Sequence, residues 1–286
     1  TPILLLLNSI AMGATNGVAI LLSQAIGAGE TRRTRTILFT SFILSIVFSL
    51  GMTGLLEGMV SPLLRFLQVP SELYEMTCLY LRIYLIGYGA VYLYCYFAAV
   101  LRSFGDTVFQ MLAMLVCTVL NGALDPLLIH GFGLQGAAAA TVLSQGICLG
   151  FMVCYLRKKA LFSFHAADWS GKELGTICLK SLPAAFQQSI PAISTSVLTA
   201  IVSGFGVTAL AAYGVAGKLE LLLFYPAMSF QMVLTTIVGQ CIGAGRRDRA
   251  WVYCKTALLW GGGLLIILSC GVVGLAHPLS ELFVDS

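Results

Sequence analysis

Charged residues are scarce in this sequence. They make up 10% of the chain, whereas hydrophobic residues make up 58% and the mean hydropathy is +0.93. An ordinary globular domain carries about 25% charged residues, so this composition excludes a water-soluble domain. The net charge of +4 does not indicate a nucleic-acid partner, because the basic residues lie in a few loops between apolar runs. We therefore expect an integral membrane protein that has the lipid bilayer as its partner and binds no nucleic acid.

Motifs for metals, disulfides and nucleotides are also lacking. The three histidines lie in loops or near the ends of apolar runs, and the nine cysteines show no C-x-x-C spacing. We interpret the cysteines as small apolar residues and expect no metal site. Residues 131–136 read as G-x-G-x-x-G, but no strand precedes them, so they do not predict a dinucleotide site. No nucleophile and base cluster lies within the apolar runs, so an intramembrane enzyme is the less favoured alternative and no cofactor is expected.

Long apolar runs are what the sequence does contain. A transmembrane helix needs about 20 mostly apolar residues, and no run alternates as a membrane barrel strand would. Only helices or closed barrels satisfy their backbone groups in lipid, so we predict an all-α integral membrane fold. The eight predicted spans are 3–26, 37–57, 76–101, 108–130, 136–156, 182–205, 208–238 and 251–275.

The sequence also resembles itself at an offset of 216 residues. Gln24–Gly29 returns as Gln240–Gly245 with five of six residues unchanged, and Arg33 recurs as Arg249. Alternation of the spans places both loops on one side of the membrane, which requires an even number of helices per repeat. Thirteen of the sixteen basic residues then fall on that side, as the positive-inside rule expects for the cytoplasm. The repeat therefore predicts two parallel six-helix lobes.

Counting helices along the repeat divides the chain into three parts. We expect an N-terminal lobe over 1–156 (helices 2–6 of twelve), a cytoplasmic linker over 157–181 and the start of a C-terminal lobe over 182–286 (helices 7–9). On this count both lobes are truncated, and the chain is a fragment.

Three motifs follow one another along the fourth and fifth spans. They are Leu101–Thr107 with the pattern Arg-x-x-Gly-Asp-Thr, Asn121–Ile129 with Asn-x-x-x-Asp-Pro, and Gly133–Thr141 with Gly-Ala-Ala-x-Ala-Thr. In this order they resemble the multidrug and toxic compound extrusion (MATE) family, of the MOP superfamily. The resemblance implies a V-shaped cavity between two lobes, alternating access, and export of amphipathic, often cationic compounds in exchange for H⁺ or Na⁺. We expect a monomer in the cell membrane; a flippase for lipid-linked saccharides is the alternative within transport.

Asp125 and Asn121 are the first candidates for ion coupling. They are four residues apart, so they share one helix face. A carboxylate in the membrane costs about 2.5–3.5 kcal/mol on insertion scales and by default indicates function. The alternative is structural, with Asp125 capping amides freed by Pro126. The resemblance implies that both join a protonation network, although that network also uses a carboxylate on the first helix, which this chain lacks.

Lys218 and Glu220 lie inside the seventh span, where the first repeat has no charge. Residues two apart do not face each other on a helix, so mutual neutralisation is not expected. They are candidates for coupling or for lining the cavity, and the alternative is structural pairing with other helices.

Two polar sets are candidates for the substrate cavity. Gln187, Gln188 and Ser194 follow Pro183 in the sixth span, with interhelical hydrogen bonding as the alternative. The second set is a stripe of aromatic rings at helical spacing in the third span. Ring faces of this kind can bind cations; the alternatives are packing against other helices or a lipid-facing belt. These rings are Tyr84, Tyr88 and Tyr92.

Arg102, Gly105 and Asp106 lie in a short cytoplasmic turn. Their spacing predicts an Arg102–Asp106 salt bridge that clasps the turn, and a positive-inside anchor is the simpler alternative. Arg82 is expected to snorkel or to pair with Glu72 or Glu75.

Overall fold

The computed structural model describes residues 2–66, 71–159 and 169–274, which form eight α-helices in these ranges. Each predicted span lies within or closely overlaps one helix. The helices are α1 (Pro2–Gly27), α2 (Thr31–Phe66), α3 (Ser71–Ser103), α4 (Thr107–Phe132), α5 (Leu134–Lys158), α6 (Gly171–Ser203), α7 (Val207–Gly243) and α8 (Arg247–Gly274).

Seven helices of the described residues are long and apolar enough to cross a membrane. The exception, α6, is long enough, but its first turns carry Lys172, Glu173 and Lys180. It begins at Gly171, inside the segment predicted as linker, where Ser170 caps it by accepting a hydrogen bond from the Glu173 N–H. The protein is thus a multi-pass membrane protein, and α6 has an amphipathic start of the kind that lies at a membrane surface.

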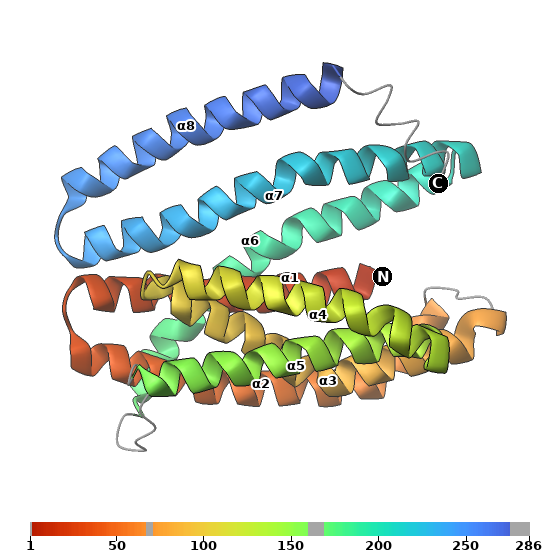
Figure 1. Ribbon diagram of the computed structural model, residues 1–286, viewed down its shortest axis with the longest axis horizontal. Helices are drawn as coiled ribbons and strands as arrows, with labels where there is room; N and C mark the ends of the chain where they lie inside the picture. Colours follow the sequence, from red (N-terminus) through yellow and green to blue (C-terminus); the bar gives the residue numbers. More distant parts are fainter. Residues whose placement is uncertain (1, 67–70, 160–168, 275–286) are drawn as a thin grey trace.

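The helices form two groups (Figure 1). Helices α1 to α5 pack together, α7 and α8 form a pair, and α6 runs from the first group to the second. α1 lies in the middle, because it packs against α2 and α3 on one side and against α6 and α7 on the other. The core of the first group consists of two buried apolar clusters, whose members come mainly from α1, α2, α3 and α5.

The repeat in the sequence is a repeat in the backbone. α1 and α7 each end in a Schellman turn, with Gly29 at φ 72° and Gly245 at φ 71°. The 6→1 hydrogen bond of each turn has the same place, from the Glu30 N–H to the Ala25 carbonyl (3.1 Å) and from the Arg246 N–H to the Cys241 carbonyl (2.9 Å). Positive φ favours glycine, which explains why both copies keep Gly at this position.

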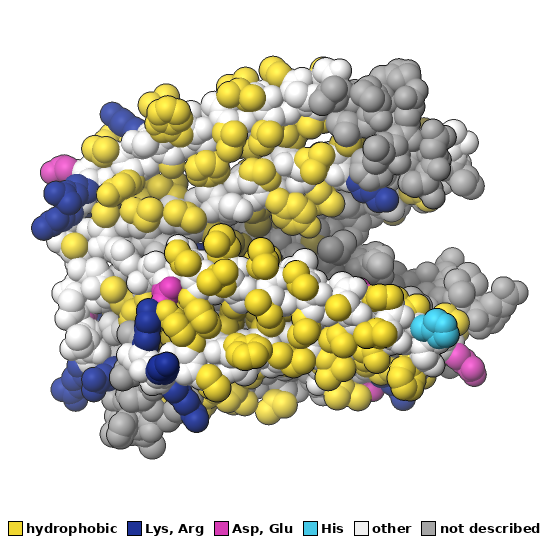
Figure 2. Space-filling model, in the orientation of Figure 1, with side chains coloured by type: hydrophobic (Ala, Val, Ile, Leu, Met, Phe, Trp, Pro, Cys, Tyr) yellow, Lys and Arg dark blue, Asp and Glu magenta, His cyan; other side chains and the backbone are white. Residues whose placement is uncertain are grey.

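Most of the Lys and Arg side chains visible in Figure 2 lie at one end of the helices, and the long flanks are covered by hydrophobic side chains. We call this the arginine-rich end; it carries the α1–α2 and α7–α8 turns with Arg32, Arg33, Arg246, Arg247 and Arg249. At the opposite end Figure 2 shows a hollow between the α7–α8 pair and the α4–α5 pair. The two helix groups are therefore joined at the arginine-rich end and apart at the other.

Candidate functional site

Asp125 lies on α4 among residues from three helices. Asn121, one turn earlier, donates from Nδ2 to Thr141 Oγ1 on α5 at 3.5 Å. Asp125 acts electrostatically on Tyr80 of α3, and its Oδ1 is buried with no hydrogen-bond partner among the described residues. A buried acceptor without a partner costs about 1–3 kcal/mol, so this oxygen is an unfavourable feature of the described structure.

The capping alternative for Asp125 has no support in the described residues, where its carboxylate makes no hydrogen bond to a backbone amide. α4 continues through Pro126 to Phe132, and Pro126 has no N–H to offer the Gly122 carbonyl one turn earlier. The Gly122 carbonyl, about one turn before Asp125, thus receives no hydrogen bond from position 126.

Thr141 and Tyr80 are members of this site that the sequence did not single out. Thr141 meets Asn121 because Gly133, at φ 63°, reverses the chain between α4 and α5. The two helices then approach closely, since a Cβ at Gly136 would clash with the main chain at Leu128. The spacing of about ten residues on either side of this turn is the signal that could have paired Asn121 with Thr141.

The other coupling candidates lie on a different helix. Lys218 and Glu220 are both on exposed positions of α7, in the second helix group, whereas Asp125 is on α4 in the first. Of the polar cavity candidates, Gln188 is buried, and Gln187 and Ser194 are exposed on α6. Adjacent Gln residues on one helix therefore have different environments, and only Gln188 lies within the packed part of α6.

The tyrosine stripe is part of the core, which corrects the prediction of a cavity wall. Tyr84, Tyr88 and Tyr92 are at most 4% exposed and belong to the cluster between α1, α2 and α3. Their hydroxyls are also engaged: Tyr84 donates to Asn8 Oδ1 (3.2 Å) and Tyr88 to the Leu7 carbonyl (3.0 Å). A ring enclosed by aliphatic and aromatic neighbours cannot receive a cation on its face, so the packing alternative is the one observed.

Asp106 does not pair with Arg102, which corrects the predicted clasp. Its Oδ2 accepts hydrogen bonds from Lys159 Nζ (2.8 Å) and Tyr155 Oη (2.6 Å), and its Oδ1 caps α4 at the Phe109 N–H (3.4 Å). The reason is the turn at Gly105, where φ is 79°; Asp106 thereby faces the end of α5. Arg102 is instead partly buried, with its Nε unpartnered among the described residues.

These bonds set the ionisation of the pair. Hydrogen bonds from Lys159 and Tyr155 hold the pKa of Asp106 below its usual value, and the bond to Asp106 raises the pKa of Lys159. The Tyr155 ring also stacks on Phe109, with centroids 3.6 Å apart and planes at 4°. The Asp106 site therefore ties α4 to α5 within one helix group.

A third correction concerns the predicted partner of Arg82. Arg82 pairs with Glu57 at 3.5 Å and not with Glu75, and the side chain of Glu72 lies outside the described residues.

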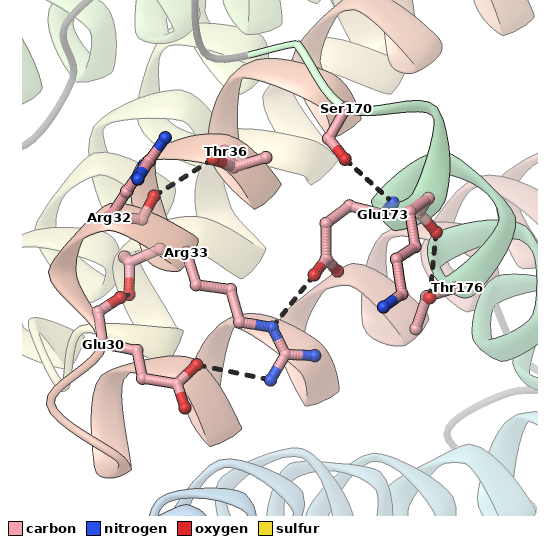
Figure 3. Close-up of polar contacts among 9 residues, drawn as sticks. Glu30, Arg32, Arg33, Thr36, Ser170, Glu173 and Thr176 are labelled. Atoms are coloured by element: carbon pink, nitrogen blue, oxygen red, sulfur yellow. Dashed lines mark hydrogen bonds and ion pairs between the residues drawn. The ribbon is translucent and has the colours of Figure 1, made fainter.

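Figure 3 shows how the start of α6 is held at the arginine-rich end. Arg33 of α2 donates from Nε to Glu173 Oε1 (3.0 Å) and from Nη1 to Glu30 Oε2 (3.4 Å). The Ser170 N–H donates to Thr40 Oγ1 of α2 at 3.4 Å. A surface hollow of about 810 Å³ lies beside these residues. The start of α6 is thereby anchored to α2 of the first helix group by an ion pair that sequence spacing did not reveal.

The two groups meet along a seam in which main chains touch. On the α6 side, a Cβ at Gly13 or Gly17 of α1 would clash with the main chain of Ala185 or Ser181, respectively, and Ser181 Oγ donates to the Ala14 carbonyl at 3.0 Å. We call the contacts of α1 with α6 and α7, from Gly13 to Gly27, the seam. It closes the space between the groups from the middle of α1 to the arginine-rich end.

On the α7 side, the seam joins the two copies of the repeat to each other. A Cβ at Gly27 would clash with the Gln240 carbonyl, and one at Gly243 with the Gln24 carbonyl. Gln240 also donates from Nε2 to the Ser103 carbonyl of α3 at 2.8 Å. The contact is reciprocal, as two copies related by a twofold axis require.

Comparison with known proteins identifies relatives of this arrangement. A family model described as MatE matches residues 1–127 and 183–286. A probable multidrug resistance protein of Bacillus subtilis, YoeA, is 29% identical over 99% of this chain and 64% of its own length. An FAD transporter of Shewanella oneidensis is 28% identical over the same shares. The solved outward-facing conformation of a multidrug resistance MATE family transporter matches with a TM-score of 0.89 at 25% identity, over 100% of this chain and 65% of that one. The chain thus spans just under two thirds of the length of these relatives.

Proposed function

The chain belongs to the MATE family of multidrug efflux transporters, and on this premise we propose that the protein is a secondary antiporter in the cell membrane. It exports amphipathic, often cationic compounds in exchange for H⁺ or Na⁺ by alternating access. The single observation that carries the coupling step is Asp125, whose Oδ1 is buried and has no partner among the described residues, in a span that holds no other Asp, Glu, Lys or Arg. An ionised carboxylate in that position is costly, and a bound proton or cation removes the cost.

The surroundings of Asp125 suit either coupling ion. Protonation would turn the carboxyl group into a hydrogen-bond donor, and the Gly122 carbonyl left free by Pro126 is an acceptor on the same helix. For Na⁺, the oxygens of Asp125, Asn121 and Thr141 are hard ligands of the kind that such cations prefer. We propose H⁺ or Na⁺ as the coupling ion, with no other cofactor.

The arrangement of the two helix groups supports an outward-open state. The positive-inside rule places the arginine-rich end in the cytoplasm. The seam closes this end, and the hollow between the groups opens at the other. In this state a compound leaves toward the outside, and the cycle continues when the seam parts.

Family membership does not select the substrate, since relatives of equal similarity are named for multidrug resistance and for FAD transport. The proposal of a cationic substrate rests instead on acceptor oxygens between the helix groups. Asn16 Oδ1 and Ser23 Oγ of α1 are both buried and unpartnered among the described residues, and acceptors bind donors and positive charge.

The test is transport of ethidium by the purified protein in liposomes, with H⁺ and Na⁺ gradients imposed separately. We expect one of the two gradients to drive ethidium transport, and Asp125→Asn to lose this response while still binding ethidium. Glu30→Gln, which removes a carboxylate at the α1–α2 turn, is the matched control and should transport normally. Wild-type rates in Asp125→Asn would contradict the coupling role, and no response to either gradient would contradict antiport.

A further inference from the structure

Two side chains of the seam are buried without partners. Asn16 is 6% exposed and Ser23 is 0% exposed, yet Asn16 Oδ1 and Ser23 Oγ have no hydrogen-bond partner among the described residues. A buried acceptor without a partner is unfavourable, because it has lost its bonds to water. Thr15, the neighbour of Asn16, is just as buried but donates to the Ala11 carbonyl at 2.9 Å. The absence of partners is therefore specific to the face of α1 that carries Asn16 and Ser23.

That face points into the seam. Ser23 lies opposite Gly239 of α7, where an added Cβ would come within 2.9 Å of the Ser23 Cβ. Asn16 is seven residues earlier, two turns along the same side of α1. It also lies between Gly13 and Gly17, which pack on α6. Asn16 is thus directed toward the groove between α6 and α7, about 10 Å from Ser23 along the helix.

Along this face of α1, the side chains change from exposed to buried just before Asn16. Met12, one turn earlier, is 39% exposed, whereas Asn16 is 6% exposed. The partners across the seam are small or polar, because Gly239 faces Ser23, and Thr236 and Gln188 are buried polar residues of α7 and α6. Glycine by itself does not distinguish the seam from a permanent contact, because transmembrane helix interfaces are generally rich in small residues. A permanent contact would, however, pair its buried oxygens. The unpaired oxygens therefore suit a surface that is wet in another state.

From these observations we propose that Asn16 and Ser23 form an inward-facing binding site, whose oxygens accept hydrogen bonds from the N–H groups of an amphipathic cation when the seam parts at the arginine-rich end. The inference rests on the alternating access of the proposed function. It adds a site that is hidden in the outward-open state and is loaded from the cytoplasmic side. In that site Ser23 lies nearer the arginine-rich end, and Asn16 lies farther from it.

The experiment compares two cations with the full protein in liposomes. Ethidium carries amino N–H donors, and tetraphenylphosphonium carries none. For substrate added at the arginine-rich face, Asn16→Ala should raise the KM for ethidium about fivefold, the effect of one hydrogen bond, and leave the KM for tetraphenylphosphonium unchanged. Asn16→Asp keeps the acceptor and should restore the ethidium KM. Thr15→Ala removes a neighbouring buried hydroxyl that bonds within its own helix, so it should change neither KM.

Two results would overturn the site. One is an ethidium KM in Asn16→Ala equal to that of wild type; the other is an equal rise for both cations, which indicates a general effect on seam opening. If the wild type moved neither cation, the proposed function would fail by itself. Fluorescence titration of ethidium against the purified protein would then decide the site, since equal Kd values for wild type and Asn16→Ala would contradict it.

Discussion

Gly27 of α1 lies directly against the main-chain carbonyl of Gln240 of α7. Its counterpart in the second repeat, Gly243, has the same relation to Gln24. The two helices therefore meet backbone to backbone where the helix groups join, and nothing larger than a hydrogen atom fits at either position.

Gly27→Ala should push the seam apart. Overpacking of this kind costs about 1–3 kcal/mol, which shifts a two-state equilibrium about 5- to 150-fold. Cys241 lies in the last turn of α7, next to the seam residue Gln240, and its thiol reports on seam opening. Its labelling by a water-soluble maleimide, read by peptide mass spectrometry, should become at least severalfold faster than in wild type. The exposed Cys178 gives the reference rate within the same sample.

Gly262→Ala is the matched control, because an added Cβ on that part of α8 meets no atom within 4 Å. It should leave the Cys241 labelling rate unchanged. Equal labelling of Cys241 in Gly27→Ala and wild type would show that the seam does not respond to this contact.

A reversible cross-link should lock the seam. Ser23 and Gly239 face each other so closely that Ser23→Cys combined with Gly239→Cys brings two thiols within disulfide reach. Oxidation should stop ethidium transport, and reduction should restore it, because alternating access requires the seam to open. Each single cysteine variant controls for the substitution itself. Full transport by the cross-linked protein would contradict opening at this seam.

The Asp106 site predicts a pH-dependent contribution to stability. The pKa of Asp106 is lowered in the folded protein by its bonds to Lys159 and Tyr155, relative to the ordinary 3.8. The unfolded chain then takes up a proton at higher pH than the folded one, so the contribution is complete above about pH 5 and declines as the pH falls through the lowered value. Asp106→Asn should lower the unfolding free energy by about 1 kcal/mol at pH 7, and the difference should vanish in strong acid.

Thermal unfolding in detergent from pH 3 to pH 8 measures this difference. Tyr155→Phe keeps the ring that stacks on Phe109 and removes only the hydroxyl bond to Asp106, so it should show a smaller loss with the same pH dependence. A loss in Asp106→Asn that is constant across this range would assign the effect to helix capping alone.

The Arg33–Glu173 pair predicts a local effect on α6. Glu173 is 16% exposed and its Oε2 is buried without a partner, so removal of Arg33 leaves a carboxylate that is poorly solvated. In Arg33→Gln, amide hydrogen exchange across residues 171–177 should become about tenfold faster. Arg32→Gln, one residue away in the same turn, is the control and should leave this segment as it is (Figure 3). Equal exchange in the two variants would mean that the ion pair does not hold α6.

The helices and the repeat were predictable because each rests on a one-dimensional signal. Apolar runs of membrane length give the spans, and matched loops such as Gln24–Gly29 and Gln240–Gly245 show the duplication. Both turns then proved to have the same glycine conformation. Sequence reasoning also selected Asp125 and Asn121 correctly as neighbours on one helix face, although the coupling role of these residues stays a prediction.

Contacts between helices were less predictable, because a face of an apolar helix can meet lipid, a cavity or another helix with the same residues. The stripe from Tyr84 to Tyr92 has the spacing of a cavity wall, but its rings pack in the core. Arg102 and Asp106 are close in sequence, yet the turn at Gly105 directs Asp106 to Lys159. Thr141 and Glu173 gain their partners from distant segments, and spacing along the chain carries little information about such pairs.

The glycine seam has an energetic consequence. Where side chains interlock, separating two helices leaves empty sockets and exposes large apolar groups, at a cost that grows with every residue. Gly13, Gly17 and Gly27 lie directly against the main chain of the neighbouring helix. Separating the helices there leaves few unfilled spaces between side chains. It also lets water form hydrogen bonds with oxygen atoms that have no partner in the closed seam. In the proposed alternating-access cycle the open and closed arrangements would then differ by little free energy, and the binding of one ion at Asp125 would be enough to decide which of them is populated.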